Sequence, residues 1–432
     1  KADAAAKNLL DANRMEASAR FEGDFRDLAF LKALLPDTAL RRRAAIPALI
    51  RLRGSAGADR GTFSTASTLS ADGGELSVKG RFNPREQSYD AAIRADSFPL
   101  NSFLPADSLG IVDLTLQARG TGFDPLLPRT RTSLRAQIDR AEFGGRDFGG
   151  IELDAELDSQ RLSGRISDRD EALRLLLSVS GTLTEREQRI GLSGSVFGFD
   201  LAALGVSPEP IGGSFALDAS ASAAGKGAYA ARIALDSIEI RNKHRTDRIR
   251  PTSVSLHTDS AATRAEAASG DLSLTFSTPQ SADSLIAALT RSARALAGQI
   301  DAQSIDMEQL KPALPDFALR VSAGPDNILN SLLKSRKIAL DALNAEGVNC
   351  DSLPVSIRLR TEGLAYGNVV LDTVTADIRQ NGKRLEYALG LANAPGNLDN
   401  IARAGQYGHL VRNTGQANLY QRNRAGRWSA RA

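Results

Sequence analysis

The sequence predicts a mainly β protein: a long, curled, repetitive and largely antiparallel β-sheet, shaped like a groove or a taco, with a few short capping helices. Apolar residues alternate with polar residues in short runs, as in strands that bury one face. Turn-forming residues separate these runs, and two groups of segments repeat their spacing further along the chain. Together these features predict a train of hairpins.

The alternating runs read as strands that place apolar side chains on one face. A hairpin is expected where Asn381-Gly382 separates two such runs, because this dipeptide favours a type I′ turn. The clearest runs are Met15–Phe21, Leu114–Ala118, Ile151–Leu157, Val374–Ile378 and Leu385–Leu389.

Two pairs of segments share their apolar and turn positions at a constant offset. The stretch Gly80–Phe103 recurs as Gly181–Leu204, and Phe143–Leu162 recurs as Tyr366–Leu385. The apolar positions are kept while most surface residues differ. A single match of this kind can arise from β composition alone, but two gapless matches indicate a repeated sheet unit.

Two segments break the strand rhythm with helical spacing. The first starts at Ser281 as N-cap and closes at Gly298, and the second follows Gly324-Pro325-Asp326. Their apolar positions are Leu285, Leu289, Ala293 and Leu296 in the first and Ile328, Leu329, Leu332 and Leu333 in the second.

We expect these helices to plug or cap a sheet. A membrane-surface role would need a larger basic face than Arg291, Arg294, Lys334 and Arg336 provide. The predicted organisation is therefore a groove segment over residues 1–280, a helix-containing insertion or cap over 281–345, and a continuation of the groove over 346–432.

Composition excludes several classes of protein. Hydrophobic residues make up 42% of the 432 residues and aromatics only 5%, which is little for compact cores built around large side chains. The net charge of +3 is spread along the chain, so nucleic acid is not implied. With a single cysteine, Cys350, and three scattered histidines, we expect no intramolecular disulfide, no metal site and no cofactor.

Motifs that resemble catalytic signatures are better explained by structure. Asp147-Phe148-Gly149 matches a protein-kinase triplet, but no His-Arg-Asp loop accompanies it, and the internal copy has Val370 in place of Asp147. Phe148 is therefore expected to be a packing residue. Gly120-Thr121-Gly122 lacks the lysine and helix start of a phosphate loop and is expected to be a turn.

Other candidate reactive groups also have simpler explanations, so we expect no enzymatic activity. Four acids alternate with apolar residues and should project to one wet face without the aromatic platform of a glycosidase. Cys350 has no activating neighbour and is expected to be a small strand or turn residue. Arg41–Arg43 is expected to be a solvated loop, with contact to lipid headgroups as the alternative. The four acids are Glu152, Asp154, Glu156 and Asp158.

A train of hairpins with one apolar face needs something to cover that face. About 20 to 25 strands at roughly 4.8 Å each would extend on the order of 100 Å. If the sheet curls, small side chains leave room for acyl chains, which gain about 0.8 kcal/mol per methylene group transferred from water. The candidate groove-lining residues are Leu114, Leu116, Ala118, Ile151, Leu153, Ala155, Val374, Ala376 and Ile378.

Several segments resemble the AsmA-like/TamB family. The unit Gly110–Pro125 is similar to the repeats of AsmA-like and TamB proteins. The resemblance covers most of residues 60 to 400, through degenerate structural motifs. The segments that look like TamB forms of Bacteroidetes are Ala268–Phe276 with the helix after it, Leu314–Asp316, Ala323–Asn327 and Leu371–Val374 leading to Asn393–Asn397.

This resemblance implies a middle-region fragment of a translocation and assembly module subunit. Such a protein is anchored in the inner membrane of a Gram-negative bacterium, spans the periplasm and carries phospholipid toward the outer membrane. The family is linked to outer-membrane biogenesis and protein secretion with an outer-membrane barrel partner, and it brings no catalytic residues. Because the chain opens at Lys1 and has no long apolar run, the anchor is expected outside this fragment.

Two other hypotheses remain open from the sequence. The same repeats would suit a structural scaffold for outer-membrane protein translocation and assembly, without an open groove. A β-helix polysaccharide enzyme would need a regular coil period of about 20 to 25 residues. The sequence does not show that period.

Overall fold

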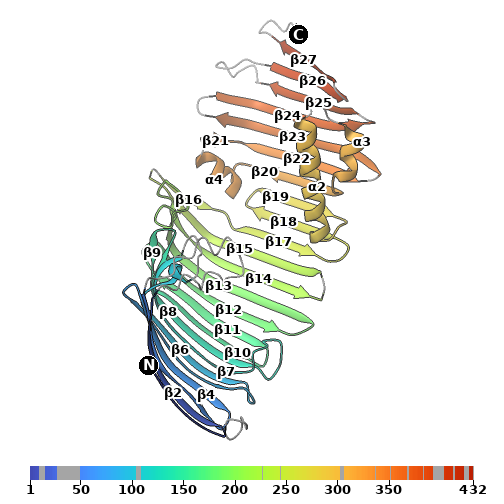
Figure 1. The fold of residues 1–432 in the computed structure, drawn as a ribbon. Helices are drawn as coiled ribbons and strands as arrows, with labels where there is room; N and C mark the ends of the chain where they lie inside the picture. The colour runs from blue at the N-terminus through green and yellow to red at the C-terminus, as the bar shows by residue number, and fades with distance from the viewer. Residues whose placement is uncertain are drawn as a thin grey trace. The chain divides into compact units, whose positions relative to one another are not determined.

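The protein is mostly β, as the sequence predicts, and every described strand pair is antiparallel (Figure 1). The structure is a computed structural model. It describes residues 1–8, 15–26, 49–103, 109–225, 227–243, 245–301, 306–335, 337–350, 352–366, 369–382, 384–392, 403–411, 414–422 and 428–431.

The chain forms two compact units. The first contains Lys1–Leu217 and Arg241–Arg245, and the second contains Asp218–Ile240 and Thr246–Ala432. The boundary falls inside strand β14 (Gly212–Ala224) and near the end of β15 (Ala228–Arg241).

The first unit is a meander in which each strand pairs with the next along the chain. The exception is β9, a short strand that pairs with β8 before β10 continues along the same neighbour. One 3-10 turn, η2 (Leu100–Ser102), follows β6. The strands are β1 (Ala2–Lys7), β2 (Glu16–Arg26), β3 (Leu49–Asp59), β4 (Thr62–Ala71), β5 (Gly74–Asn83), β6 (Ser88–Pro99), β7 (Leu109–Thr121), β8 (Arg131–Phe143), β9 (Arg146–Phe148), β10 (Ile151–Asp158), β11 (Arg161–Arg169), β12 (Leu173–Leu183) and β13 (Glu187–Asp200).

Alternation decides which face of each strand is apolar. In β10, Ile151, Leu153, Ala155 and Leu157 are half-buried while the acids between them are exposed. Successive side chains of a strand point to opposite faces, so this pattern gives one apolar and one charged face. The strands of the first unit curve along their length, which makes the sheet curl around one face (Figure 1).

The second unit continues the antiparallel pattern and adds helices. β15 pairs with β17, and β20 pairs with β22 across the segment that holds α4. Its further strands are β16 (Thr246–Ile249), β17 (Thr252–Thr258), β18 (Thr263–Ser269), β19 (Leu272–Thr278), β20 (Phe317–Ala323), β21 (Ile338–Ala339), β22 (Ala342–Cys350), β23 (Leu353–Tyr366), β24 (Val369–Asn381), β25 (Arg384–Ala392), β26 (Arg403–Val411), β27 (Thr414–Arg422) and β28 (Trp428–Arg431).

Helix α2 (Ala282–Asp301) begins where the sequence predicts and ends later. Ser281 is its N-cap: the backbone N–H of Ser284 donates to Ser281 Oγ at 3.3 Å. The prediction that Gly298 closes the helix is wrong, since the helix continues to Asp301. Gln299 instead exchanges two hydrogen bonds with the backbone of Asp306, just before the next helix.

Two further helical segments hold α2 against the sheet. They are α3 (Met307–Leu310) and the 3-10 turn η3 (Lys311–Ala313). Met307 and Leu310 form a buried cluster with Val355 of β23, and Ala295 of α2 packs against it. The helices therefore cap the sheet at one end of its strands, as expected.

Helix α4 (Ile328–Ser335) lies at the other end of the strands in the second unit (Figure 1). Asn327 caps it by accepting from the Asn330 N–H at 2.8 Å, and its own amide donates to Asp271. Of the four predicted apolar positions, Leu332 is exposed and the other three are half-buried. Both helices lie within the predicted 281–345 insertion, which also contains β20.

The predicted hairpin forms between β24 and β25, with its turn displaced by one residue. Asn381 pairs with Arg384 at the end of the ladder, so Asn381 is the last residue of β24 and Gly382 follows it in the turn. Gly382 has a positive φ of 58°. A type I′ turn centred on Asn381-Gly382 would place both residues in the left-handed conformation. In the structure Gly382 has this conformation, and Asn381 belongs to the strand.

Replacing Asn330 with alanine is expected to destabilise the second unit by about 2 kcal/mol, because buried carbonyls lose their donors. Asn330 is 1% exposed, and its amide donates to the carbonyls of Pro325 and Leu340 at 3.0 and 2.8 Å. Asn344→Ala, on an exposed position of β22, is the matched control. Denaturant titration distinguishes them, and equal midpoints for both variants would contradict this assignment.

Candidate functional site

The apolar face of the first unit is built from side chains that the register aligns in rows across the strands. Leu116 of β7 pairs with Ala136 of β8, which pairs with Leu153 of β10. The row continues through Ile166 of β11 to Leu177 of β12. An antiparallel ladder places paired residues on the same face, so the row runs perpendicular to the strands.

All six groove-lining residues predicted in β7 and β10 fall on this face, in three adjacent rows. β8 supplies the side chains between them. The rows are Leu114–Ile138–Ile151, Leu116–Ala136–Leu153 and Ala118–Leu134–Ala155.

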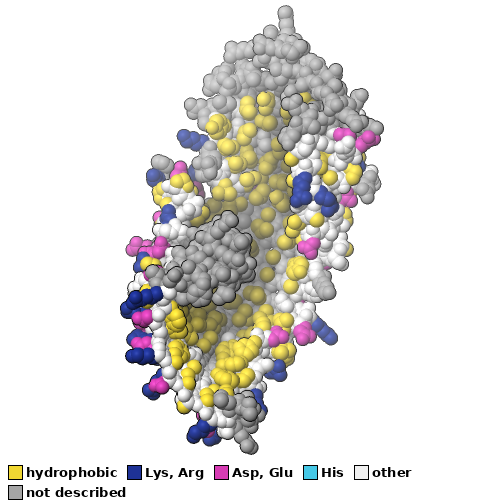
Figure 2. Space-filling model, in the orientation of Figure 1, with side chains coloured by type: hydrophobic (Ala, Val, Ile, Leu, Met, Phe, Trp, Pro, Cys, Tyr) yellow, Lys and Arg dark blue, Asp and Glu magenta, His cyan; other side chains and the backbone are white. Residues whose placement is uncertain are grey.

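This face is only partly covered by the described part of the chain. The three predicted residues of β10 and the three of β7 are half-buried, whereas fully buried apolar side chains are few and scattered. One small cluster, Ile50 and Ala71 with Leu69 and Phe103, lies at an end of the strands. Figure 2 shows hydrophobic side chains lining the hollowed side of the sheet in the first unit.

Small residues keep the floor of the hollow low along one row. Three of the four residues in this row are small, and Leu134 is the exception. The row is Ala118–Leu134–Ala155–Gly164. At Gly164 an added Cβ would lie 2.8 Å from the Asp154 carbonyl oxygen, closer than such atoms approach. The glycine therefore lets two strands approach closely beneath the hollow.

The opposite face of the same strands is charged and wet. Arg135 Nε donates to Asp154 at 3.0 Å and Arg131 Nε donates to Asp158 at 2.9 Å, both across the β8–β10 pair. These exposed pairs contribute little stability each, but they define the face that meets water. The acids of β10 thus serve the solvated side, as expected from their alternation.

The remaining three predicted lining residues, Val374, Ala376 and Ile378, lie in β24 of the second unit. Each is half-buried and pairs with a residue of β23: Thr361, Leu359 and Ile357 respectively. On the other side they pair with Leu391, Leu389 and Tyr387 of β25. They form an apolar floor in that unit, separate from the six residues of the first.

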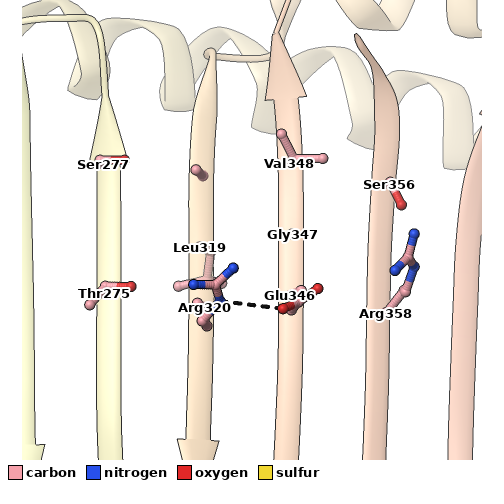
Figure 3. Close-up of a pocket in the computed structure, with 10 residues that line it drawn as sticks. Thr275, Ser277, Leu319, Arg320, Glu346, Gly347, Val348, Ser356 and Arg358 are labelled. Atoms are coloured by element: carbon pink, nitrogen blue, oxygen red, sulfur yellow. Dashed lines mark hydrogen bonds and ion pairs between the residues drawn. The ribbon is translucent and has the colours of Figure 1, made fainter.

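A shallow depression lies on the polar face of the second unit (Figure 3). Arg320 of β20 donates to Glu346 of β22 at 3.3 Å, with Thr275 and Arg358 on the flanking strands. The helices lie behind the sheet in this view. Exposed, ion-paired side chains of this kind are typical of a solvated sheet face.

Comparison with known proteins adds no relative to this description. No protein family, curated protein or solved structure matches the chain. What the faces can bind therefore has to follow from their geometry.

One carboxylate on the apolar face was not identified from the sequence. Asp168 of β11 is 7% exposed and stands between Ile151 and Leu175 in the ladder. Burial raises its pKa, although the Asp170 N–H donates to Oδ1 at 2.9 Å and works in the opposite direction. The signal in the sequence is the position of Asp168 two residues after Ile166, which places both side chains on the same face of the strand.

We expect Asp168→Asn to stabilise the protein relative to wild type as pH rises above the ordinary aspartate range. A raised folded-state pKa means that the wild type is most favoured when Asp168 is protonated, and this contribution is lost as pH rises through the folded pKa. Unfolding midpoints between pH 3 and pH 8 measure the difference, with pH values chosen to bracket about 3.9.

Asp259→Asn provides a control of opposite sign. The N–H groups of Ala261 and Ala262 lower the pKa of Asp259, so its contribution is present above the ordinary range and is lost as pH falls. If the difference in unfolding midpoint between Asp168→Asn and the wild type does not change with pH, the carboxyl of Asp168 is not desolvated.

The motifs with catalytic resemblance occupy structural positions. Asp147 pairs with Arg140 at 3.0 Å on β9, and Phe148 is half-buried beside Ala141. Asp147 and Phe148 thus belong to β9, and Gly149 lies between β9 and β10, where an added Cβ would collide with the Asp139 carbonyl.

Further sequence candidates are also accounted for within the described residues. Gly122 has a φ of 78° and donates to the Gln87 carbonyl, as expected of a turn. Cys350 ends β22, and its thiol contacts Ser352 Oγ at 3.4 Å, a hydrogen bond that lowers its pKa. Arg41–Arg43 and Asn393–Asn397 lie outside the described residues.

The described residues contain neither a candidate membrane-spanning helix nor a candidate metal site. No described helix combines the length and the apolar character needed to cross a membrane. No three His, Cys, Asp or Glu side chains in the described ranges are grouped as metal ligands.

Proposed function

We propose that this chain is a non-enzymatic conduit that binds the acyl chains of phospholipid along its apolar face. The observation that carries the proposal is the set of continuous apolar rows that cross many strands and stay half-exposed, above a charged outer face. Soluble proteins rarely leave apolar surface of this extent open unless something binds there.

The physical gain fits a ligand made of methylene groups. Each methylene group moved from water onto such a surface gains about 0.8 kcal/mol, and this gain has no directional requirement. Because each row offers apolar side chains on successive strands, a bound acyl chain would find similar binding energy from one strand to the next. That uniformity favours movement along the sheet over tight retention at one place.

The resemblance to AsmA-like/TamB proteins supplies the proposed setting. There the conduit would move phospholipid between the inner and outer membranes through the periplasm and support outer-membrane biogenesis. An inner-membrane anchor outside this segment and an outer-membrane barrel protein would be its attachments. No catalytic residue, cofactor or nucleic acid belongs to this proposal.

Native mass spectrometry with lipid extraction, on this segment expressed in the periplasm, tests the proposal. Co-purifying phospholipid is the expected result. A folded, stable segment that carries no lipid, and takes up none from phospholipid vesicles, would refute lipid binding and favour the scaffold for outer-membrane protein assembly.

A further inference from the structure

Helix α2 carries two neighbouring apolar stripes, of which only one is used for packing. Ala288 and Ser292 are buried, with Leu285 and Ala295 half-buried on the same side. One residue further along each turn lies a second stripe whose large side chains are exposed. These are Ile286 at 62%, Leu289 at 51% and Leu296 at 41%, with Ala293 between them.

The helix runs across the strands, parallel to the rows of the sheet. The Ala282 N–H donates to Thr258 Oγ1 of β17 at 3.0 Å, and Ala295 packs against the cluster that contains Val355 of β23. The ladder from β17 to β23 through β18, β19, β20 and β22 spans about 24 Å. From Ala282 to Ala295 the helix rises about 20 Å, so it follows this ladder.

The direction of the helix determines where the exposed stripe points. α2 lies over the apolar face near one end of the strands (Figure 1). Each residue of a right-handed helix turns by about 100° relative to the previous one. The buried side of α2 carries Ser292, whose Oγ donates to the Ala313 carbonyl, and Ala295, which packs against the cluster with Val355. When this side is turned toward the sheet and the helix runs from β17 toward β23, the Leu289 stripe faces the middle of the strands. Arg291 and Arg294 lie on the outward and solvent sides.

The floor beside this stripe is an unbroken row of apolar or small residues. Leu256 and Ile357 at its two ends are exposed, and the residues between them are half-buried except Gly347. No charged residue occurs in the row or in the helix stripe. The row is Leu256–Ala265–Phe276–Leu319–Gly347–Ile357.

Row and stripe therefore form two sides of an apolar slot, the row as floor and α2 as wall. Figure 2 shows hydrophobic side chains on the sheet surface in the second unit. An elongated ligand in the slot would be shielded from water on two sides, by the floor and by the wall. On the open part of the sheet, the floor would shield only one side of the same ligand. The slot follows the rows, the direction in which the proposed conduit would carry its ligand.

We propose that this slot, between the Leu289 stripe of α2 and the Leu256–Ile357 row, holds an acyl chain of a phospholipid. The inference rests on the proposed function, because it takes its ligand class from the conduit. An acyl chain matches the slot in having no charge and no hydrogen-bonding groups, as neither stripe nor row offers a charged partner. A polypeptide would also bring backbone polar groups, for which an apolar wall and floor have no partners.

Site-specific photocrosslinking distinguishes the slot from the conduit as a whole. A benzophenone amino acid replaces Leu289, Ala287 or Leu153 in the full chain, which is then illuminated with vesicles of phosphatidylethanolamine and phosphatidylglycerol carrying a radiolabelled fraction. Ala287 is exposed on the water side of the same helix and serves as the matched control. Circular dichroism is the check that all three variants keep the wild-type fold.

We expect the benzophenone at position 289 to form about tenfold more lipid adduct than the one at position 287. This is the ratio of affinities that corresponds to contact with about two additional methylene groups of the acyl chain. Equal labelling at Leu289 and Ala287, with strong labelling at Leu153, would overturn the slot and leave the conduit intact. Absence of lipid adducts at all three positions would overturn both. A protein adduct at Leu289 in place of lipid would overturn the acyl chain as occupant.

Discussion

Phospholipid bound to the purified chain is expected to fall by about tenfold or more when Leu153 is replaced with arginine. Leu153 lies near the centre of the apolar rows of the first unit, half-buried between Ala136 and Ile166. A guanidinium there removes contact with about two methylene groups, and each contributes about 0.8 kcal/mol. The charge also makes the neighbouring surface costly for an acyl chain to cover.

Glu156→Arg is the matched control for this prediction. Glu156 belongs to the same strand but is exposed on the charged face, so its replacement changes net charge in the same direction without touching the rows. Lipid extraction followed by mass spectrometry should give wild-type amounts for Glu156→Arg. Equal loss in both variants would point to charge as the cause, and retention in both would place the lipid elsewhere.

The second large effect concerns the cap of the second unit: Met307→Ala is expected to lower the free energy of unfolding by about 3 kcal/mol. Met307 is 2% exposed and packs in the cluster with Leu310 and Val355, which joins α3 to the sheet. Truncation leaves a void that its neighbours, in a β-strand and a single-turn helix, have little freedom to fill.

Gln309→Ala, one exposed residue of the same helix, should change stability by less than about 0.5 kcal/mol. Denaturant unfolding measures both variants. Hydrogen exchange adds a local readout, because α2 loses protection if α3 no longer holds it. Unchanged protection of α2 in a destabilised Met307→Ala protein would separate the cluster from the positioning of α2.

The strands and their apolar faces were largely predictable because period-two alternation is a local property. In β10 the sequence alone separates Leu153 from Asp154, and the structure places them on opposite faces as expected. Register is not local, however. That Ala136 of β8 stands between Leu116 and Leu153 follows only from the paired strands.

For helix α2, the start was predictable from the local sequence, but the end and the buried face were not. Ser281 was identified as a cap because an N-cap depends on its own hydrogen bond to a residue three positions away. Gly298 does not end the helix, and Gln299 after it exchanges two hydrogen bonds with the backbone of Asp306, a contact that helix propensity does not include. The buried face of α2 is likewise set by the cluster around Met307, which leaves Leu289 exposed.

Asp168 illustrates a different limit. Its sequence neighbourhood, Ser167-Asp168-Arg169-Asp170, reads as a polar strand end, and the alternation with Ile166 indicates which face Asp168 lies on without indicating its burial. Burial results from Ile151 and Leu175 on the adjacent strands, which only the register brings beside it. The pKa shift of this carboxyl is therefore a property of the sheet.

The most direct test of the central claim is a photocrosslinking scan along β10, with a benzophenone amino acid placed in turn at Leu153, Asp154, Ala155 and Glu156 in cells with radiolabelled phospholipid. If the apolar face binds acyl chains, lipid adducts should alternate with the strand: strong at Leu153 and Ala155, weak at Asp154 and Glu156. Uniform labelling at all four positions, or labelling confined to the charged face, would contradict the account.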